Sequence, residues 1–328
     1  MKILFVLCAA LTLAACGPTP GDCADGGDCS DAGADAGASD APRTSRWVPY
    51  IDGSFTRVFR PAGTRYLNDH TLVRGADGQW HLYGITHEST GMPQAERSFL
   101  HATAPSLRGP WREEADILMA MGSERVLWAP FVFPAENGHW VMYFWAGTPD
   151  QRTQRADSTD LVRWTRDPRS VPGGRDPFVL RVGAEWYFYS VGVSAPVGDN
   201  AYGQILVTHS ADLEHWATPT VALQDPVLNF GWGNLESPTV VVRDDGYYLF
   251  VTRTSESRID YARTVVFHST DPSRFAWEPV TEMLTHAAEV FEADGQEYIT
   301  AAGWTIQLGA LWRGLSIAKL GWARREGG

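Results

Sequence analysis

The sequence predicts an all-β fold, a five-bladed β-propeller whose blades are four-stranded antiparallel sheets. Paired apolar and aromatic runs, separated by Gly, Asp or Asn, recur five times at intervals of roughly 45–60 residues. A short turn that ends in tryptophan follows most of these pairs, and helical periodicity is hard to find after the N-terminal segment. Repeats of this length, with strand signals throughout, are typical of propeller blades.

Each repeat contains a predicted β-hairpin, in which a short apolar strand, a turn and an aromatic strand follow one another. The five hairpins are Thr71–Ile85, Phe131–Gly147, Phe178–Gly192, Thr239–Arg253 and Ala288–Gly303. The chain has 14 tryptophans, and those at the ends of the turns recur at one place in the repeat, so we expect them in the blade core. They are Trp111, Trp164, Trp216 and Trp277. From its position alone, Trp47–Phe59 is expected to be the outer strand that closes the ring onto the last blade.

Residues 1–16 are predicted to be a lipoprotein signal peptide. A basic start is followed by the apolar run Ile3–Leu13, which is too short to span a bilayer as a stable anchor. The run ends in Leu-Ala-Ala-Cys16, which resembles a bacterial lipobox and implies that Cys16 becomes the lipidated first residue. We therefore expect an exported lipoprotein of the bacterial cell envelope, at the outer membrane or cell surface, that contacts the membrane through its anchor only. An ordinary cleaved secretion signal is the alternative.

Residues 17–46 are predicted to be a disordered tether, because they are rich in Gly, Ala, Asp and Ser and poor in aromatic residues. Six of the formal −12 charges are aspartates of this segment, so the predicted propeller domain, residues 47–328, is only mildly acidic. All four cysteines lie at or before Cys29. Cys23 and Cys29 are expected to pair in an oxidising compartment, or else to be two free thiols of the tether.

Several classes of function are excluded by what the sequence lacks. No Cys/His group has the spacing of a zinc site, and no glycine motif of a nucleotide-binding loop occurs between a strand and a helix. The chain has no basic patch, so nucleic acid is not an expected partner. We expect a single folded domain that is a monomer.

Three acidic residues stand directly before the first strand of a repeat: Asp69, Asp176 and Glu236. In a propeller the starts of these strands converge on one central funnel, so we expect the three carboxylates to face one substrate. Glycosidic hydrolysis needs one carboxylic acid and one carboxylate, and a third acidic group raises the pKa of the acid. The arrangement therefore predicts a carbohydrate-cleaving enzyme.

Alternative interpretations exist for Asp69 and Asp176. Asn68-Asp69 is a common turn sequence, and Asp-Pro occurs four times in the chain. At Asp167-Pro168, Asp225-Pro226 and Asp271-Pro272 we interpret it as a turn former. Only Asp176-Pro177 is followed at once by a complete hairpin, which distinguishes it from the other three.

The series of motifs resembles glycoside hydrolase family 43 and its five-bladed relatives, the fructosidases of families 32 and 68. Asp69 before the first blade, Arg175-Asp176-Pro177 before the third and Glu236-Ser237-Pro238 before the fourth match that pattern. Trp128-Ala129-Pro130 before the second and His286 before the fifth match family 43 as well. The resemblance covers about residues 60–310. Family 32 enzymes carry an additional C-terminal β-sandwich. The sequence shows no such segment after the fifth repeat, so the resemblance favours family 43.

By matched position, the resemblance implies Asp69 as general base, Asp176 as pKa modulator and Glu236 as general acid. It implies inversion of stereochemistry and no required cofactor. It also allows a structural calcium that His286 contacts through water. One position departs from family 43, where Pro normally follows the first aspartate and this chain has His70. The departure leaves open a retaining fructosidase or transfructosylase with Asp69 as nucleophile, or a non-catalytic propeller that binds glycans.

Further residues are expected at the substrate. Trp128, Trp232 and Trp304 lie near strand starts and could stack on a sugar ring. Arg253 is expected either to hydrogen-bond sugar hydroxyls or to be an ordinary surface arginine. His70 is expected to orient Asp69 or to face solvent. By the resemblance, the expected substrates are arabinose- or xylose-containing oligosaccharides and polysaccharides.

Overall fold

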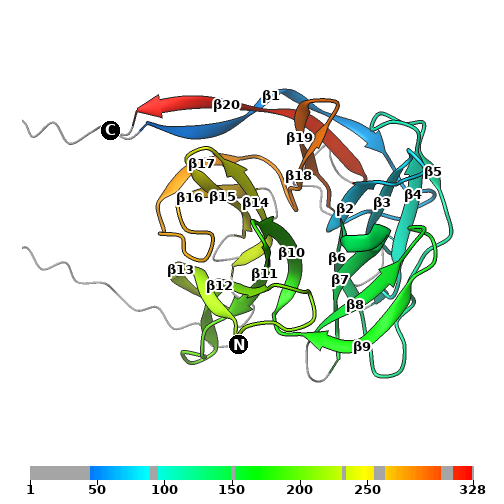
Figure 1. Ribbon diagram of the computed structural model, residues 1–328, viewed down its shortest axis with the longest axis horizontal. Coiled ribbons are helices and arrows are strands. Elements are labelled where there is room, and N and C mark those ends of the chain that lie inside the picture. The colour runs from blue at the N-terminus through cyan, green and yellow to red at the C-terminus, as the bar shows by residue number, and fades with distance from the viewer. Residues whose placement is uncertain are drawn as a thin grey trace, which may run out of the picture. The chain divides into compact units, whose positions relative to one another are not determined.

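The computed structural model describes residues 45–88, 95–148, 152–230, 234–254, 263–303 and 313–326. Apart from the short 3-10 turn η2 (Glu136–Gly138), the regular elements named within these ranges are β-strands. They form five antiparallel sheets of four strands, arranged around one centre (Figure 1). The prediction of an all-β, five-bladed propeller is confirmed. In the described part of the chain, no helix has the length and apolar character needed to cross a bilayer.

The blades follow one another along the chain. Blade 1 consists of β2 (His70–Arg74), β3 (Trp80–Ile85), β4 (Phe99–Ala104) and β5 (Arg112–Glu113). Blade 2 consists of β6 (Leu127–Pro134), β7 (Trp140–Ala146), β8 (Thr153–Ser158) and β9 (Thr165–Val171). Blade 3 consists of β10 (Arg175–Val182), β11 (Glu185–Val193), β12 (Asn200–Ser210) and β13 (Thr220–Phe230). Blade 4 consists of β14 (Leu235–Arg243), β15 (Gly246–Arg253), β16 (Thr264–Ser269) and β17 (Pro279–Met283).

Blade 5 closes the ring with strands from both ends of the domain. It consists of β18 (Val290–Ala293), β19 (Gln296–Ala301), β20 (Leu315–Glu326) and β1 (Ser45–Phe59), in the order β1-β20-β19-β18. β1 pairs antiparallel with β20 from Ser45 opposite Glu326 to Phe59 opposite Leu315, and the two strands lie side by side in Figure 1. The prediction that Trp47–Phe59 is the closing strand is confirmed, and the strand begins at Ser45. Opening the ring would require this long ladder to separate.

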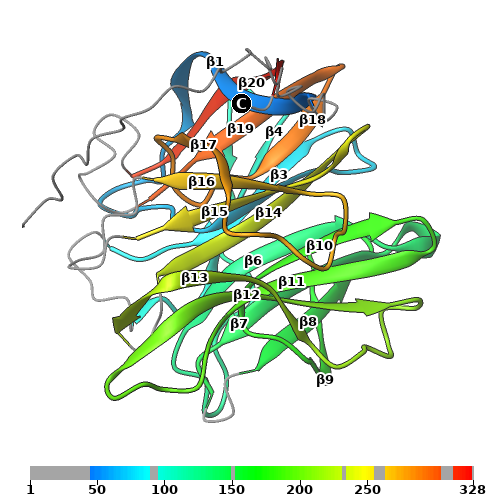
Figure 2. The ribbon, with the colours of Figure 1, turned by 90° about the vertical axis from the view of Figure 1, so that its left-hand side faces the viewer.

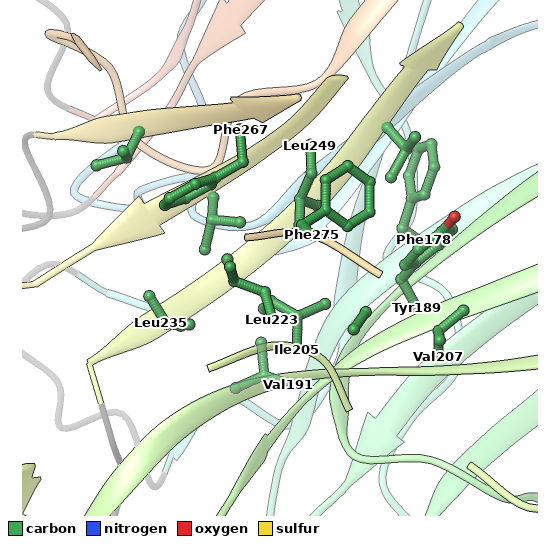
Figure 3. Packing of buried hydrophobic residues seen from close by; sticks show 14 residues of the cluster. Phe178, Tyr189, Val191, Ile205, Val207, Leu223, Leu235, Leu249, Phe267 and Phe275 are labelled. Atoms are coloured by element: carbon green, nitrogen blue, oxygen red, sulfur yellow. The ribbon is translucent and has the colours of Figure 1, made fainter. Parts of the chain in front are cut away.

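The five predicted hairpins are the pairs β2-β3, β6-β7, β10-β11, β14-β15 and β18-β19. The central strand β3 is buried on both faces, because its blade is packed between two others, and all six of its residues are buried. The side view shows the blades as stacked, twisted sheets (Figure 2). Between blades 3 and 4, apolar side chains such as Phe178, Tyr189, Leu249 and Phe267 fill the space (Figure 3).

The tryptophans at the ends of the turns pack against the edges of these clusters, as predicted. Each is partly buried against the apolar residues of a blade: Trp111, Trp164, Trp216 and Trp277. In Trp111 the indole N–H donates to the Leu107 carbonyl at 3.1 Å. These rings therefore close the outer part of the core.

The prediction that three Asp-Pro pairs form turns is wrong for two of them. Asp167-Pro168 lies within β9 and Asp225-Pro226 within β13, whereas Asp271-Pro272 does lie in a turn. β9 and β13 are the last strands of their sheets. Proline cannot donate to a ladder, but an edge strand leaves one side of its backbone unpaired and tolerates it.

The first strands of blades 2, 3 and 4 share an irregularity where they begin. The register slips between Trp128 and Phe131, between Arg175 and Phe178, and between Glu236 and Thr239. At the matching place in four blades, one residue has a positive φ: Ala129 at 49°, Asp176 at 55°, Ser237 at 50° and Ala287 at 48°. β-Bulges re-aim side chains at strand ends. We call the residue directly before each of these four the rim residue of its blade.

Candidate active site

The starts of the first strands from all five blades line one cavity on the axis, of about 30 Å³. Asp69 and Asp176 lie on its wall, together with Ser237, the neighbour of Glu236. The rim residues are Trp128, Arg175, Glu236 and His286. Positions more than a hundred residues apart in sequence therefore lie at one end of the axis.

The three carboxylates predicted from the sequence belong to one network of hydrogen bonds and ion pairs. The Ser237 hydroxyl donates to Oδ1 of Asp69 at 2.8 Å, and the Ser237 backbone N–H donates to Oδ2 of Asp176 at 3.1 Å. The Arg175 guanidinium lies 2.8 Å from Oδ2 of Asp176 and 3.2 Å from Oε1 of Glu236. Arg175 also donates to the Leu235 carbonyl at 3.3 Å, which fixes its orientation.

The carboxylates differ in their access to solvent. The side chains of Asp69 and Glu236 are 16% and 18% exposed, whereas that of Asp176 is 5% exposed. A group that handles protons of water and substrate has to be reachable, so Asp69 and Glu236 are suited to that task. Asp176 lies deeper and can act mainly through its charge.

Burial raises the pKa of all three carboxyl groups above the ordinary range. For Glu236, burial raises the pKa more than the Arg175 guanidinium lowers it. The negative charges of Asp176 and Asp69 raise it further, so that the pKa of Glu236 is about 8. For Asp69, the hydrogen bond from Ser237 and the charge of Arg175 oppose the rise. For Asp176, the charge of Arg175 lowers the pKa and the charge of Asp69 raises it, and burial remains the largest effect. Near neutral pH the cluster therefore holds a proton on Glu236.

His286, predicted at the floor of the funnel, is completely buried. Its Nε2 hydrogen-bonds to Oδ1 of Asn68 at 2.9 Å and lies 3.9 Å from Oδ1 of Asp69. Burial lowers its pKa to about 3, so the imidazole is neutral near pH 7. It holds the residue that precedes Asp69.

His70 is also buried, so the expectation that it faces solvent is wrong. Burial lowers its pKa to about 3. Neither ring nitrogen makes a hydrogen bond with any residue that the structure describes, so Asp69 is not oriented by a direct bond from His70. In this place, blades 2, 3 and 4 have Pro130, Pro177 and Pro238.

The other predicted substrate residues fall into three groups. Trp128 is a partly buried rim residue, whose ring stacks on Trp145 with centroids 5.1 Å apart. Trp232 and Trp304 lie outside the described residues. The same holds for the predicted lipidation site Cys16 and for the predicted pair Cys23 and Cys29. Arg253 pairs through Nε with Oδ2 of the fully buried Asp225 at 2.6 Å and lies over the Trp277 ring at 5.2 Å. Because Asp225 lies in β13 of blade 3, these contacts give Arg253 a structural role between blades 3 and 4.

Two residues of the network were missed by sequence reasoning. Arg175 occupies in blade 3 the position that Glu236 occupies in blade 4, and this equivalence was visible in the aligned repeats. The contribution of Ser237 depends on a positive φ that directs both its hydroxyl and its N–H toward other blades. Sequence periodicity contains no signal for such a backbone angle.

A directly bound metal ion does not fit the described residues. Across them, no three His, Cys, Asp or Glu side chains are grouped so that they could hold one. The Nε2 of His286 is already engaged by Asn68.

Comparison with known proteins gives a resemblance of fold. No family model matches the chain, and no curated protein matches it. Among solved structures, a family 43 glycoside hydrolase from Xanthomonas citri superposes with a TM-score of 0.59 at 17% identity, over 82% of this chain and 89% of that chain. A β-xylosidase/α-arabinofuranosidase of family 43 from a compost metagenome, in complex with xylotriose in a calcium-free form, has a TM-score of 0.58 at 16% identity, over 84% and 95%.

An α-L-arabinofuranosidase from Lactobacillus brevis gives a TM-score of 0.58 at 14% identity, over 80% of this chain and 94% of that chain. The expected resemblance to the family 43 five-bladed propeller is therefore confirmed at the level of the fold. At this identity, the resemblance does not assign an activity.

Proposed function

We propose that this protein is a glycoside hydrolase that cleaves neutral glycans containing xylose or arabinose, with inversion at the anomeric carbon. The observation that carries the proposal is the linked cluster of Asp69, Asp176 and Glu236, contributed by three blades and joined through Ser237 and Arg175. Two carboxyl groups that are accessible and one that is enclosed are the components that this chemistry needs.

In the proposed reaction Glu236 donates its proton to the leaving oxygen as the bond between that oxygen and the anomeric carbon breaks. Asp69 accepts a proton from a water molecule, whose oxygen attacks the anomeric carbon from the opposite side. The products are two free sugar hydroxyl groups, and the net proton transfer runs from water to the leaving group. Asp176 raises the pKa of Glu236 through its charge.

Glu236 is the better candidate for the acid because its pKa rises to about 8, which keeps it protonated near neutral pH. Asp69 is the better candidate for the base. Its Oδ1 is held by Ser237, which favours the ionised form, and its side chain remains partly accessible.

The substrate class is supported by the charge of the site and by the structural neighbours. With Glu236 protonated, the carboxylates of Asp69 and Asp176 still outnumber the single Arg175 guanidinium of the network, which disfavours an anionic glycan. The neighbours include a xylotriose complex and an α-L-arabinofuranosidase. The proposal requires no cofactor; a calcium contacted by His286 through water would serve the structure and not the chemistry. We also propose that the protein is a monomer and that it is exported as a lipoprotein.

The proposal is tested with the purified protein on aryl arabinofuranosides, xylosides, galactosides and fructans. We expect Glu236→Gln and Asp69→Asn each to lower kcat by about 10²–10⁴-fold, because each removes one proton-transfer group. Asp271→Asn, in an exposed turn, is the matched control and is expected to keep wild-type turnover. Turnover near the wild-type value in either site variant would reject the assigned role. The anomer of the first product, observed by NMR, decides between inversion and retention.

A further inference from the structure

A further hollow in the described surface lies between blades 4 and 5. It is a groove of about 640 Å³ formed by residues in or next to β1, β14, β18, β19 and β20. This volume is within the roughly 300–1,000 Å³ range of small-ligand sites. Glu236 and Arg243 stand seven positions apart in β14, so at about 3.3 Å per residue the groove is about 20 Å from the proposed acid. A ligand in the groove is therefore separate from a sugar at the catalytic cluster.

Two tryptophans on the wall of the groove are each held by one carboxylate and one arginine. The Trp47 indole N–H donates to Oδ1 of Asp244 at 2.6 Å. Arg324 donates to Oδ2 of Asp244 at 2.7 Å, and its guanidinium lies over the Trp47 ring, 4.6 Å from the centroid. The position of the Trp47 indole is therefore fixed by a residue of blade 4 and by a neighbour in blade 5.

The second tryptophan, Trp322, repeats this arrangement with other partners. Its indole N–H donates to Oε2 of Glu297 at 2.7 Å, and the Arg243 guanidinium donates to the same oxygen. Arg243 also lies over the Trp322 ring, 4.1 Å from the centroid. Both tryptophans line the groove and remain partly exposed. A ring that is ordered in advance loses less entropy on binding than a free one, so both rings are prepared for a ligand.

The two indoles lie on the same face of blade 5. In the ladder of β1 and β20, Trp47 is opposite Arg324 and Pro49 is opposite Trp322, so the two tryptophans are diagonal neighbours. Trp322 packs edge-on against Tyr248 with centroids 5.0 Å apart, whereas Trp47 has no such ring contact with the described residues. Trp47 is therefore the better stacking surface, and Trp322 forms the wall beside it.

The charges of the groove favour a neutral polar ligand. Three of its lining residues are acidic, Asp244, Glu292 and Glu297, and one is basic, Arg243. Even when Arg324 is added, the carboxylates outnumber the guanidiniums, which disfavours an anion. Aromatic rings bury apolar ligand surface, and carboxylate oxygens accept hydrogen bonds from hydroxyl groups. A saccharide offers both an apolar C–H face and hydroxyl groups.

We propose that the groove is a second glycan-binding site, which holds a neutral xylose- or arabinose-containing chain against Trp47 and Trp322. The choice of sugar rests on the proposed function, because the ligand is a part of the same polysaccharide that the catalytic cluster cleaves. A polymer bound in the groove stays at a high effective concentration near the protein. The groove should therefore promote the cleavage of a polysaccharide and leave the cleavage of a small aryl glycoside unchanged.

Binding is tested on the purified full chain carrying Glu236→Gln, titrated with xylotriose and with arabinotriose. Heteronuclear NMR of the indole N–H groups is the readout, and Trp47→Phe and Trp322→Phe assign the two signals. We expect both signals to shift and to reach saturation with at least one of the two sugars, because both indoles line the groove. Unshifted signals with both sugars would overturn the proposal.

A matched pair of valine variants places the binding in the groove. Val242 lines the groove and is 47% exposed, so Val242→Arg fills it without disturbing the core. Val221, in β13 of blade 3, is 45% exposed, and Val221→Arg is the control. We expect Val242→Arg and Trp47→Ala each to weaken binding about tenfold or more, and Val221→Arg to leave it within about twofold. Unchanged affinity in Val242→Arg, or an equal loss in Val221→Arg, would reject the site even if Trp47→Ala fails to fold.

Kinetics with Glu236 restored separate this inference from the proposed function. Val242→Arg should lower kcat/KM on arabinoxylan or arabinan about threefold to tenfold and keep turnover of the best aryl glycoside within about twofold. An unchanged rate on the polymer, or an equal loss on both substrates, would contradict the proposal. A wild-type protein that cleaves no glycoside but shows saturable shifts of the indole signals would reject the enzyme and keep the binding site. Turnover of glycosides with unshifted signals would reject the binding site alone.

Discussion

The hydroxyl of Ser237 donates a hydrogen bond of 2.8 Å to Oδ1 of Asp69, a residue 168 positions away in the sequence. The contact joins blade 4 to blade 1 and occupies one oxygen of the proposed base. It leaves the other oxygen of the carboxylate for water. The same residue binds Asp176 through its backbone N–H, so the spacing of the carboxylates depends on Ser237.

Replacing Ser237 is expected to change the ionisation of the base. In Ser237→Ala the bond to Asp69 is lost, and because this bond lowers the pKa of Asp69, that pKa rises. Asp69 is then protonated at higher pH, so the acid limb of the kcat/KM profile should move to higher pH, with kcat lowered about tenfold. Ser237→Gly tolerates the positive φ and lacks the same hydroxyl, so it should show the same shift. An acid limb that stays in place in both variants would contradict the role of the hydroxyl.

Arg175 is expected to control the alkaline limb. Its guanidinium lowers the pKa of Glu236, although burial keeps that pKa at about 8. In Arg175→Met the pKa of Glu236 rises further, and the acid stays protonated to higher pH. The alkaline limb of kcat/KM should therefore move upward by about one pH unit.

Arg175→Lys is the matched control, because it keeps the charge and loses the fork that reaches Asp176, Glu236 and the Leu235 carbonyl together. Its alkaline limb should stay near that of wild type, while kcat falls. Identical profiles for the Met and Lys variants would show that charge is not the cause.

The fold could be predicted because its signals are local and repeated. The hairpins follow from apolar runs and turn residues, and the closing strand β1 follows from its place outside the five repeats. The convergence of Asp69, Asp176 and Glu236 follows from propeller geometry once the repeat is recognised. Residues with non-local partners could not be predicted in this way. Arg253 is explained by Asp225 in the neighbouring blade, and the buried Tyr66 by Glu96. A single sequence does not contain these pairings.

The lipid anchor stays a prediction from the sequence, because Cys16 lies outside the described residues. Cys16→Ser should remove the acylation site and move the protein from the membrane fraction to the soluble fraction of a bacterial expression host. Labelling with a fatty-acid analogue should mark the wild type and not the variant. Cys23→Ser is the control and should leave both the fractionation and the labelling unchanged. Equal labelling of Cys16→Ser and wild type would rule out this anchor.

Glu289 allows a test of how the ring tolerates a buried charge. Its Oε2 accepts a hydrogen bond of 3.1 Å from the N–H of Leu72, which links blade 5 to blade 1. Burial raises its pKa to about 8 from the ordinary value of 4.5, against the opposing effects of Thr71 and Leu72. Because the folded state binds this proton more tightly than the unfolded state, the contribution of Glu289 to stability is complete below pH 4.5. It is lost progressively as the pH rises to about 8.

Glu289→Gln keeps an acceptor for Leu72 and cannot ionise. The difference in melting temperature, variant minus wild type, should therefore increase between pH 4.5 and about 8 and level off above that range. The exposed Glu292→Gln, measured by the same thermal melts, controls for the loss of one glutamate from the same blade. A difference for Glu289→Gln that is constant or decreases with pH would mean that the carboxyl group ionises in the folded ring without cost. In that case the contact with Leu72 must stabilise the charged form enough to offset its burial.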